Sequence, residues 1–428
     1  MKPKEIFNRL WKNILYILLG GVAGTLLLLL AFKLPSQKMY VHVYQSLPAL
    51  EKEFTQGLVV DGYDASLTGN FTDCLMLFYS IYDNPEHSTL EQVMHMYRTE
   101  SSAGEGWAPG ESLRDYFNGE EQSREVSYGR YWHGYLVLLK PLLMITNLNS
   151  VRMMMSVTQL LLVGMIIYAA TKRGAGNLAL GFLVSVPFFY FTSMFTSLSL
   201  SICFYIMGLA VLIPLYRHEK LKEKNRYLNF FLIVGMLVAY FDFLTYPLVT
   251  LAFPLTVVLY LDKDSWKAKL QKLVCYSIQW GVGYIGLWAM KWILSDLLTD
   301  SKVIVDAIRT VSERTGTASD GNKITGLFRV LGQNLEVYFN WSFYLLALIV
   351  VIFLIYHVVK NKYSYAKLSF LKERFVILTV ALYPVAWYFV TQNHSEEHYM
   401  FTCKNIAIMI FAVICAVTYE TAENSKGE

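Results

Sequence analysis

The chain has 428 residues, of which 55% are hydrophobic and only 16% are charged, and its net charge is +4. A soluble domain carries about 25% charged residues, and a nucleic-acid-binding protein has a stronger basic excess. The apolar residues are gathered in long runs, so the composition excludes a soluble enzyme and a nucleic-acid partner and predicts a helical membrane protein.

The first apolar run covers residues 14–32 and follows a basic tail at residues 1–13. It has nearly the ~20 residues that a crossing helix needs, and no small-residue cleavage site follows it. We therefore expect an uncleaved first helix with its basic end in the cytoplasm. Gly20, Gly21 and Gly24 give this helix a smooth face for close packing against other helices.

Residues 33–148 are mainly polar, and apolar runs resume after them. Together with the first run, these predict ten membrane-spanning helices. The nine further runs are 150–171, 176–191, 196–216, 227–242, 244–261, 273–295, 341–360, 374–391 and 399–419. The segment 131–147 is also apolar but contains Lys140 and Pro141, so we expect it to lie on the outer membrane surface rather than to cross.

The distribution of Lys and Arg predicts the orientation. The short loops near 192–195, 242–244 and 392–398 contain no basic residue, whereas the loops that alternate with them contain several. By the positive-inside rule both termini lie in the cytoplasm, and residues 33–148 and a second loop near 296–340 lie outside. We expect a mobile, turn-rich tip in this second loop.

The predicted fold is an all-α, polytopic bundle of ten spans in the plasma membrane. It has a large extracytoplasmic loop with membrane-surface helices after the first span. The transmembrane bundle covers residues 149–420, and a cytoplasmic tail covers residues 421–428.

Acidic residues in the large loop are the first candidates for chemistry. Asp73 follows Asn70 and Thr72, which can cap a helix, and precedes an apolar stretch that suits the membrane surface. Asp73 there either stabilises the helix end through the helix dipole or takes a proton from an acceptor hydroxyl or holds a divalent cation. Asp64 is a second candidate, although beside Gly62 it also suits a turn.

Basic residues just outside the apolar helices are candidates for phosphate binding. Arg130, His133 and Lys140 lie in or after an aromatic stretch, and Arg152 lies near the start of the next helix. Such side chains either reach the lipid headgroups with no further role or bind the phosphate of a lipid carrier, because Arg pairs bidentately with phosphate oxygens.

Two outer connections complete the candidate site. Asp242 is the one acidic residue of its apolar region, where a carboxylate usually faces a cavity or a partner. His394 and His398 are four residues apart and share a face if the segment is helical, and Lys404 follows them. Two histidines without a third ligand do not predict zinc, so we expect a polar cluster that faces an outer cavity.

The predicted arrangement resembles the glycosyltransferase C superfamily. It consists of one helix, then a large outer loop with an acidic residue on a membrane-surface helix, and then a helical bundle. The stretches 70–77, 130–135, 241–247 and 393–404 are also similar to uncharacterised bacterial membrane proteins of surface-polysaccharide assembly. The resemblance implies a polyprenyl-phosphate-linked sugar as donor, a glycan acceptor outside the cytoplasm, and Asp73 as the catalytic carboxylate. Asp73 lies farther beyond the first helix than the acid of many such enzymes.

Two other classes remain open. A transporter or flippase usually has ionisable residues within its spans, and here the spans are nearly free of them, Lys291 and Lys404 being the main exceptions. A non-catalytic assembly subunit is compatible with every feature of the sequence.

Overall fold

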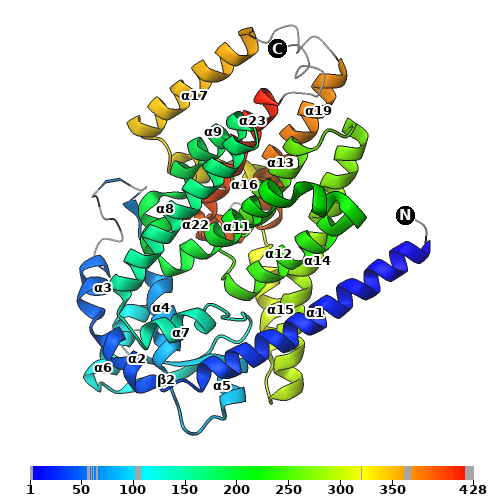
Figure 1. The fold of residues 1–428 in the computed structure, drawn as a ribbon. Coiled ribbons are helices and arrows are strands. Elements are labelled where there is room, and N and C mark those ends of the chain that lie inside the picture. Colours follow the sequence, from blue (N-terminus) through cyan, green and yellow to red (C-terminus); the bar gives the residue numbers. More distant parts are fainter. Residues whose placement is uncertain are drawn as a thin grey trace.

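The computed structural model describes residues 3–54, 58, 60, 62–63, 66–101, 108–319, 321–360 and 368–419. This part of the chain is almost entirely helical (Figure 1). Its apolar helices are α1 (Pro3–Phe32), α8 (Leu148–Lys172), α9 (Gly176–Ser185), α11 (Leu198–Lys222), α12 (Arg226–Phe241), α13 (Val249–Leu261), α14 (Trp266–Leu298), α17 (Trp341–Lys360), α19 (Leu368–Leu378), α20 (Tyr383–Val390) and α23 (Ile406–Thr418).

The segment between α1 and α8 folds into short elements that gather at one end of the molecule (Figure 1). They are α2 (Ser36–Tyr44), α3 (Leu47–Phe54), α4 (Asn70–Ile81), α5 (Thr89–His95), α6 (Pro109–Asn118), α7 (Leu136–Leu143) and the strands β1 (Tyr97–Ser101) and β2 (Gln122–Ser127). The two strands pair antiparallel, and the sequence analysis did not predict them. Helix α7 has eight residues, too few to cross a membrane.

Shorter helical pieces connect the apolar helices. They are the 3₁₀ turns η3 (Val186–Phe189), η4 (Glu223–Asn225), η5 (Thr379–Leu382) and η6 (Cys403–Asn405), and the helices α10 (Phe191–Thr196), α15 (Val303–Arg314), α16 (Lys323–Glu336), α21 (Gln392–Glu397) and α22 (Tyr399–Thr402). Helices α15 and α16 replace the predicted second outer loop. Their connecting turn is anchored, because Ser319 donates through its backbone N–H and its hydroxyl to Glu396 at 2.7 Å each.

Within the described part of the chain, six segments are long and apolar enough to cross a membrane, which indicates a membrane protein. They are Glu5–Phe32, Leu148–Lys172, Leu198–Phe241, Trp341–Lys360, Leu371–Val390 and Tyr399–Thr418. The third contains both α11 and α12, separated by η4, where Lys224 and Asn225 have positive φ. Gly176–Phe189 and Val249–Leu261 are shorter apolar helices. Each of the ten predicted apolar runs thus falls on helical segments, although not every segment meets the length and composition of a span.

Glycines bring three helices into close contact. A Cβ at Gly20 or Gly24 of α1 would lie 2.3 Å from Met236 or 2.6 Å from Tyr240 of α12, which confirms the predicted smooth face. The closest approach joins α12 and α14, because a Cβ at Gly283 would lie 2.0 Å from a backbone oxygen of α12. These contacts fix the position of α14, which forms one wall of the site described below.

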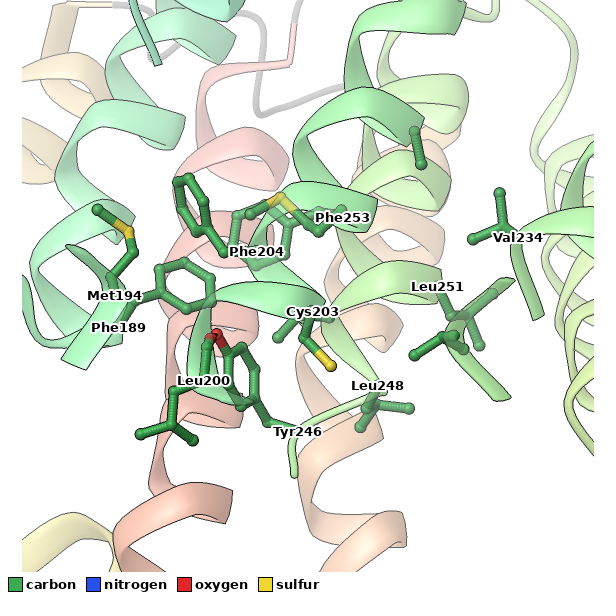
Figure 2. Close-up of a cluster of buried hydrophobic side chains, with 14 of the residues drawn as sticks. Phe189, Met194, Leu200, Cys203, Phe204, Val234, Tyr246, Leu248, Leu251 and Phe253 are labelled. Carbon is green, nitrogen blue, oxygen red and sulfur yellow. The ribbon is translucent and has the colours of Figure 1, made fainter. Parts of the chain in front are cut away.

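The core of the bundle lies between η3, α11, α13 and α23. Figure 2 shows Phe189, Phe204 and Phe253 grouped there above Tyr246, whose hydroxyl donates to the backbone oxygen of Leu200. The ring of Phe189 lies 5.4 Å from that of Phe204 and 5.7 Å from that of Phe253. This packing holds the start of α13, and with it the turn that precedes α13.

Candidate functional site

A polar chamber of about 680 Å³ opens where five parts of the chain meet. Its wall comes from α4, the segment before α7, the turn between α12 and α13, and helices α15, α21 and α22. The charged and imidazole side chains in this wall are Arg130, Glu313, Arg314, His394, Glu397 and His398.

An aromatic groove of about 250 Å³ lies beside the polar chamber. One side is a ladder of rings along α14, formed by Trp280, Tyr284, Trp288 and Trp292, and Trp387 of α20 also lines the groove. The four rings follow an i, i+4 spacing, which places them on one helix face. Neighbouring ring centroids are 4.9, 4.9 and 6.2 Å apart.

The polar chamber and the aromatic groove share part of their walls. Arg130, Tyr131, Leu244, Thr310 and Arg314 line both. Among the described residues, no acidic side chain lines the groove. The two arginines therefore lie at the boundary between a polar space and an apolar one.

Arg130 is held in place by the residues around it. Its Nη1 donates to Asp306 Oδ2 at 2.9 Å, and its guanidinium lies 4.4 Å from the ring centroid of Tyr128 and 5.7 Å from that of Tyr131. Its Nε is buried and has no hydrogen-bond partner. Arg130 thus lies at a cavity, whereas its predicted contact with a phosphate stays a prediction.

Arg314 ends α15 and has an analogous arrangement. Its Nη1 lies 3.0 Å from Glu397 Oε2. The carboxylates that hold the two arginines are both about half exposed, with side-chain exposures of 52% for Asp306 and 55% for Glu397. Each arginine therefore has a partner that water screens, and a bound anion could replace or join that partner.

His394 and His398 both line the polar chamber, as the sequence predicted. Helix α21 ends at Glu397, and the two ring centroids are 4.8 Å apart. Burial, followed by the charge of Arg314, lowers the pKa of His398 to about 4. Burial also lowers the pKa of His394 well below its usual value, with smaller contributions from His398 and Arg314. Both imidazoles are neutral at pH 7.

Asp242 supports the chamber without lining it. It is almost fully buried, accepts a hydrogen bond from the backbone N–H of Thr245 at 2.9 Å and also accepts from the hydroxyl of that residue. These bonds form a tight turn that includes Leu244, whose φ is +66°. The carbonyl oxygen of Leu244 lies 2.8 Å from His394 Nε2, so the turn fixes the imidazole.

His133 lies behind the chamber wall rather than in it. Its Nε2 is 3.0 Å from the carbonyl oxygen of Tyr128, and its Nδ1 is 3.1 Å from the hydroxyl of Tyr135. Burial lowers the pKa of His133 to about 3. The predicted phosphate contact is not supported by this position, because the ring is buried and bonded to protein groups at both nitrogens.

Asp73 does not face the membrane surface, in contrast to the prediction. It is 0% exposed, and neither cavity includes it. Its carboxylate accepts hydrogen bonds from the backbone N–H groups of Leu198 and Ser199 at 2.9 and 3.1 Å and from the hydroxyls of Ser197 and Ser199. These donors form the first turn of α11, so Asp73 caps that helix from a distance. Its own helix begins after Gly69 with no side-chain cap.

Arg152 is committed to carboxylates of the protein. It forms a bidentate pair with Glu53 at 2.6 and 3.0 Å and lies 3.8 Å from Asp73. Burial raises the pKa of the Asp73 carboxyl, whereas Arg152 and the hydrogen bonds favour its charged form. Arg152 is outside both cavities, so the predicted phosphate contact is not available to it here.

Three buried lysines donate hydrogen bonds to backbone carbonyl oxygens of the protein. Lys140 donates to the carbonyl oxygen of Ser80 at 2.8 Å, at the end of α4. Lys291 donates to two carbonyl oxygens at the end of α5, at 2.8 and 3.0 Å, and Lys404 donates to that of Met400 at 2.8 Å. A cation is favourable at a helix C-terminus. The predicted roles of Lys140 and Lys404 in phosphate binding are therefore not supported by their positions.

The remaining candidates concern metal and carboxylate chemistry. Asp64 lies outside the described residues. Within the described part of the chain, no group of three or more His, Cys, Asp or Glu side chains is arranged to hold a metal ion.

Two features of the site were missed by the sequence analysis. Arg314 lies in the segment that was predicted to be the second outer loop, and only the pairing of α15 with α21 brings it to the chamber. The ring ladder was visible as Trp280, Tyr284, Trp288 and Trp292 at four-residue spacing. In an apolar helix such spacing is also typical of membrane-interface residues, so the pattern alone did not indicate a groove.

No protein-family model matches the chain, and neither the curated proteins nor the solved structures include one that is significantly similar to it.

Proposed function

We propose that the chain is a membrane glycosyltransferase that moves a sugar from a polyprenyl-phosphate carrier to an extracytoplasmic glycan acceptor during cell-surface polysaccharide assembly. One observation carries the proposal: Arg130 and Arg314 line both the polar chamber and the aromatic groove. A lipid-linked sugar has an apolar chain, a phosphate and a polar sugar in that order, and the groove, the arginine pair and the chamber offer matching surroundings in the same order.

The chemistry fits the groups in the chamber. A sugar–phosphate bond already contains its leaving group, so the protein needs to stabilise the departing phosphate and to receive one proton from the acceptor hydroxyl. Arg130 and Arg314 supply fixed positive charge for the phosphate. Neither a nucleotide site nor a covalent nucleophile is required.

The proposed membrane arrangement keeps ten spans in the plasma membrane, both termini in the cytoplasm and residues 33–148 outside. It is supported by the positions of the chamber segments, because residues 128–131, 243–245 and 393–398 all belong to connections assigned to the outer side. Maleimide added from outside should label Ser123→Cys on β2 and leave Lys220→Cys on α11 unlabelled. The reverse labelling pattern would invert the topology.

The decisive experiment measures binding of polyprenyl phosphate to the purified chain in nanodiscs. Arg130→Gln and Arg314→Gln should each weaken binding about 10- to 100-fold, because each removes a charge-assisted contact with the phosphate. Arg309→Gln is the matched control, since Arg309 lies on α15, the helix that ends at Arg314, and it is exposed and pairs with Glu313. Equal affinity in all four proteins would remove the arginine pair from the site.

A flippase or a non-catalytic subunit would bind the same lipid phosphate without transfer. Release of polyprenyl phosphate from a polyprenyl-phosphate-linked hexose separates these alternatives from the enzyme. Binding without release would exclude the glycosyltransferase and retain the lipid site.

A further inference from the structure

His394 has an unusual position among the ionisable groups of the polar chamber. Its Nε2 lies 2.8 Å from the carbonyl oxygen of Leu244. A carbonyl only accepts hydrogen bonds, so the ring proton of this neutral imidazole lies on Nε2 and Nδ1 carries a lone pair. Nδ1 is buried and has no hydrogen-bond partner, although buried polar atoms nearly always have one.

The other basic groups in the chamber wall are already engaged. Glu397 pairs with Arg314 at 3.0 Å, and Glu313 pairs with Arg309 at 3.0 Å. His398 stacks on Phe401 and is more exposed than His394. His394 therefore offers a free lone pair that is both shielded from bulk water and fixed in orientation.

We propose that His394 Nδ1 is the general base that receives the proton of the acceptor hydroxyl in the polar chamber. This inference rests on the proposed function and names a catalytic group for it. The acceptor O–H bond breaks as its oxygen forms a bond to the anomeric carbon, and the proton moves to Nδ1. The bond between the anomeric carbon and the phosphate oxygen breaks, and its electron pair leaves with the lipid phosphate. The resulting imidazolium returns its proton to the phosphate or to water.

The charges that surround His394 suit this cycle. Besides His394, the charged and titratable groups of the chamber wall are His398, Arg314, Glu397, Glu313, Arg130, Tyr128 and Tyr131. Burial, followed by the charges of His398 and Arg314, lowers the pKa of His394 well below its usual value, so the base form predominates at pH 7. A phosphate bound at Arg314 would offset that positive charge and raise the proton affinity of the imidazole when transfer begins. Catalytic hydrogen bonds often tighten only in the substrate complex, so a small shift of the wall can bring the hydroxyl to Nδ1.

The test compares His394→Gln with His398→Gln in the full chain in nanodiscs. The glutamine amide retains a donor for the Leu244 carbonyl and removes the imidazole base. Release of polyprenyl phosphate from a polyprenyl-phosphate-linked hexose should fall about 10²–10⁴-fold in His394→Gln, while polyprenyl phosphate binding stays equal to wild type. His398→Gln should change release far less.

Each outcome supports or overturns the assignment of His394 as the general base. Normal release by His394→Gln overturns the base and leaves the proposed function intact, whereas absence of both binding and release in wild type overturns the proposed function as well. If His394→Gln does not fold, ¹⁵N NMR of histidine-labelled wild type decides. A bare Nδ1 whose pKa rises on addition of polyprenyl phosphate supports the base, and a protonated Nδ1 or an unchanged pKa overturns it.

Discussion

Two sets of charged residues lie close together in this molecule, and they differ in what satisfies them. The first set, Asp73, Lys140, Arg152 and Lys291, is buried and bonded to helix ends or to protein carboxylates, although Arg152 Nε has no hydrogen-bond partner. The second set, in the chamber wall, keeps half-exposed partners or buried atoms with no partner. The comparison teaches that burial and proximity to a cavity do not by themselves indicate a binding residue. The residues of the first set hold the segment before α8 against the bundle, whereas the residues of the second set are available to a ligand.

The largest expected effect concerns Asp73. Asp73→Ala should lower the free energy of unfolding by about 3 kcal/mol, because it leaves the first N–H groups of α11 without their buried acceptor and removes the second carboxylate near the guanidinium of Arg152, which keeps its pair with Glu53. Asp306→Ala is the matched control, since Asp306 also pairs with an arginine but is 52% exposed, and it should cost less than about 1 kcal/mol. Chemical unfolding in detergent measures both, and equal costs would erase the distinction between the two sets.

The second prediction concerns pH. Burial lowers the pKa of Lys140 to about 8 in the folded protein, whereas an unfolded lysine titrates near 10.4. Between these values the unfolded chain binds more protons, so stability should rise with pH across this window. The wild type should gain on the order of 1–3 kcal/mol over Lys140→Met between about pH 8 and pH 10. If the free energies of unfolding of the two proteins changed in parallel with pH, Lys140 would not be buried. The control is Lys33→Met, since Lys33 is exposed.

The smallest effect on folding is expected for the chamber arginines. Arg130→Gln and Arg314→Gln should each change the free energy of unfolding by less than about 1 kcal/mol, because their partners are half exposed. Polyprenyl phosphate at 100 times its dissociation constant should stabilise wild type by about 2.7 kcal/mol. At that same concentration the gain should fall to about 0.4–1.4 kcal/mol in both variants, because their binding is about 10- to 100-fold weaker. A large decrease in the free energy of unfolding without ligand would show that these arginines belong to the first set instead.

Helix positions were well predicted because hydrophobic runs determine them locally. The position of Arg130, His394 and His398 at a cavity was also predicted from the sequence, since charge and connection length are local properties. The roles of Lys140, Arg152 and Asp73 could not be predicted from such local properties. Their partners are Ser80, Glu53 and the first turn of α11, which are distant in sequence, and a basic residue near an interface has the same local pattern whether it binds lipid phosphate or a helix end. Arg314 was missed for the related reason that its role depends on the pairing of α15 with α21.

The contact between Gly283 and α12 also limits how the site can move. A single methyl group has no room at that crossing, so α12 and α14 behave as one rigid plate that carries the ring ladder and the turn at Asp242. Rearrangement around a ligand is therefore directed to the opposite side, where α15 and α21 are held by the exchangeable ion pairs of Arg130 and Arg314. Under the proposed function, α12 and α14 would set the path of the lipid chain, and the side of α15 and α21 would be the side that moves when the sugar and the acceptor exchange.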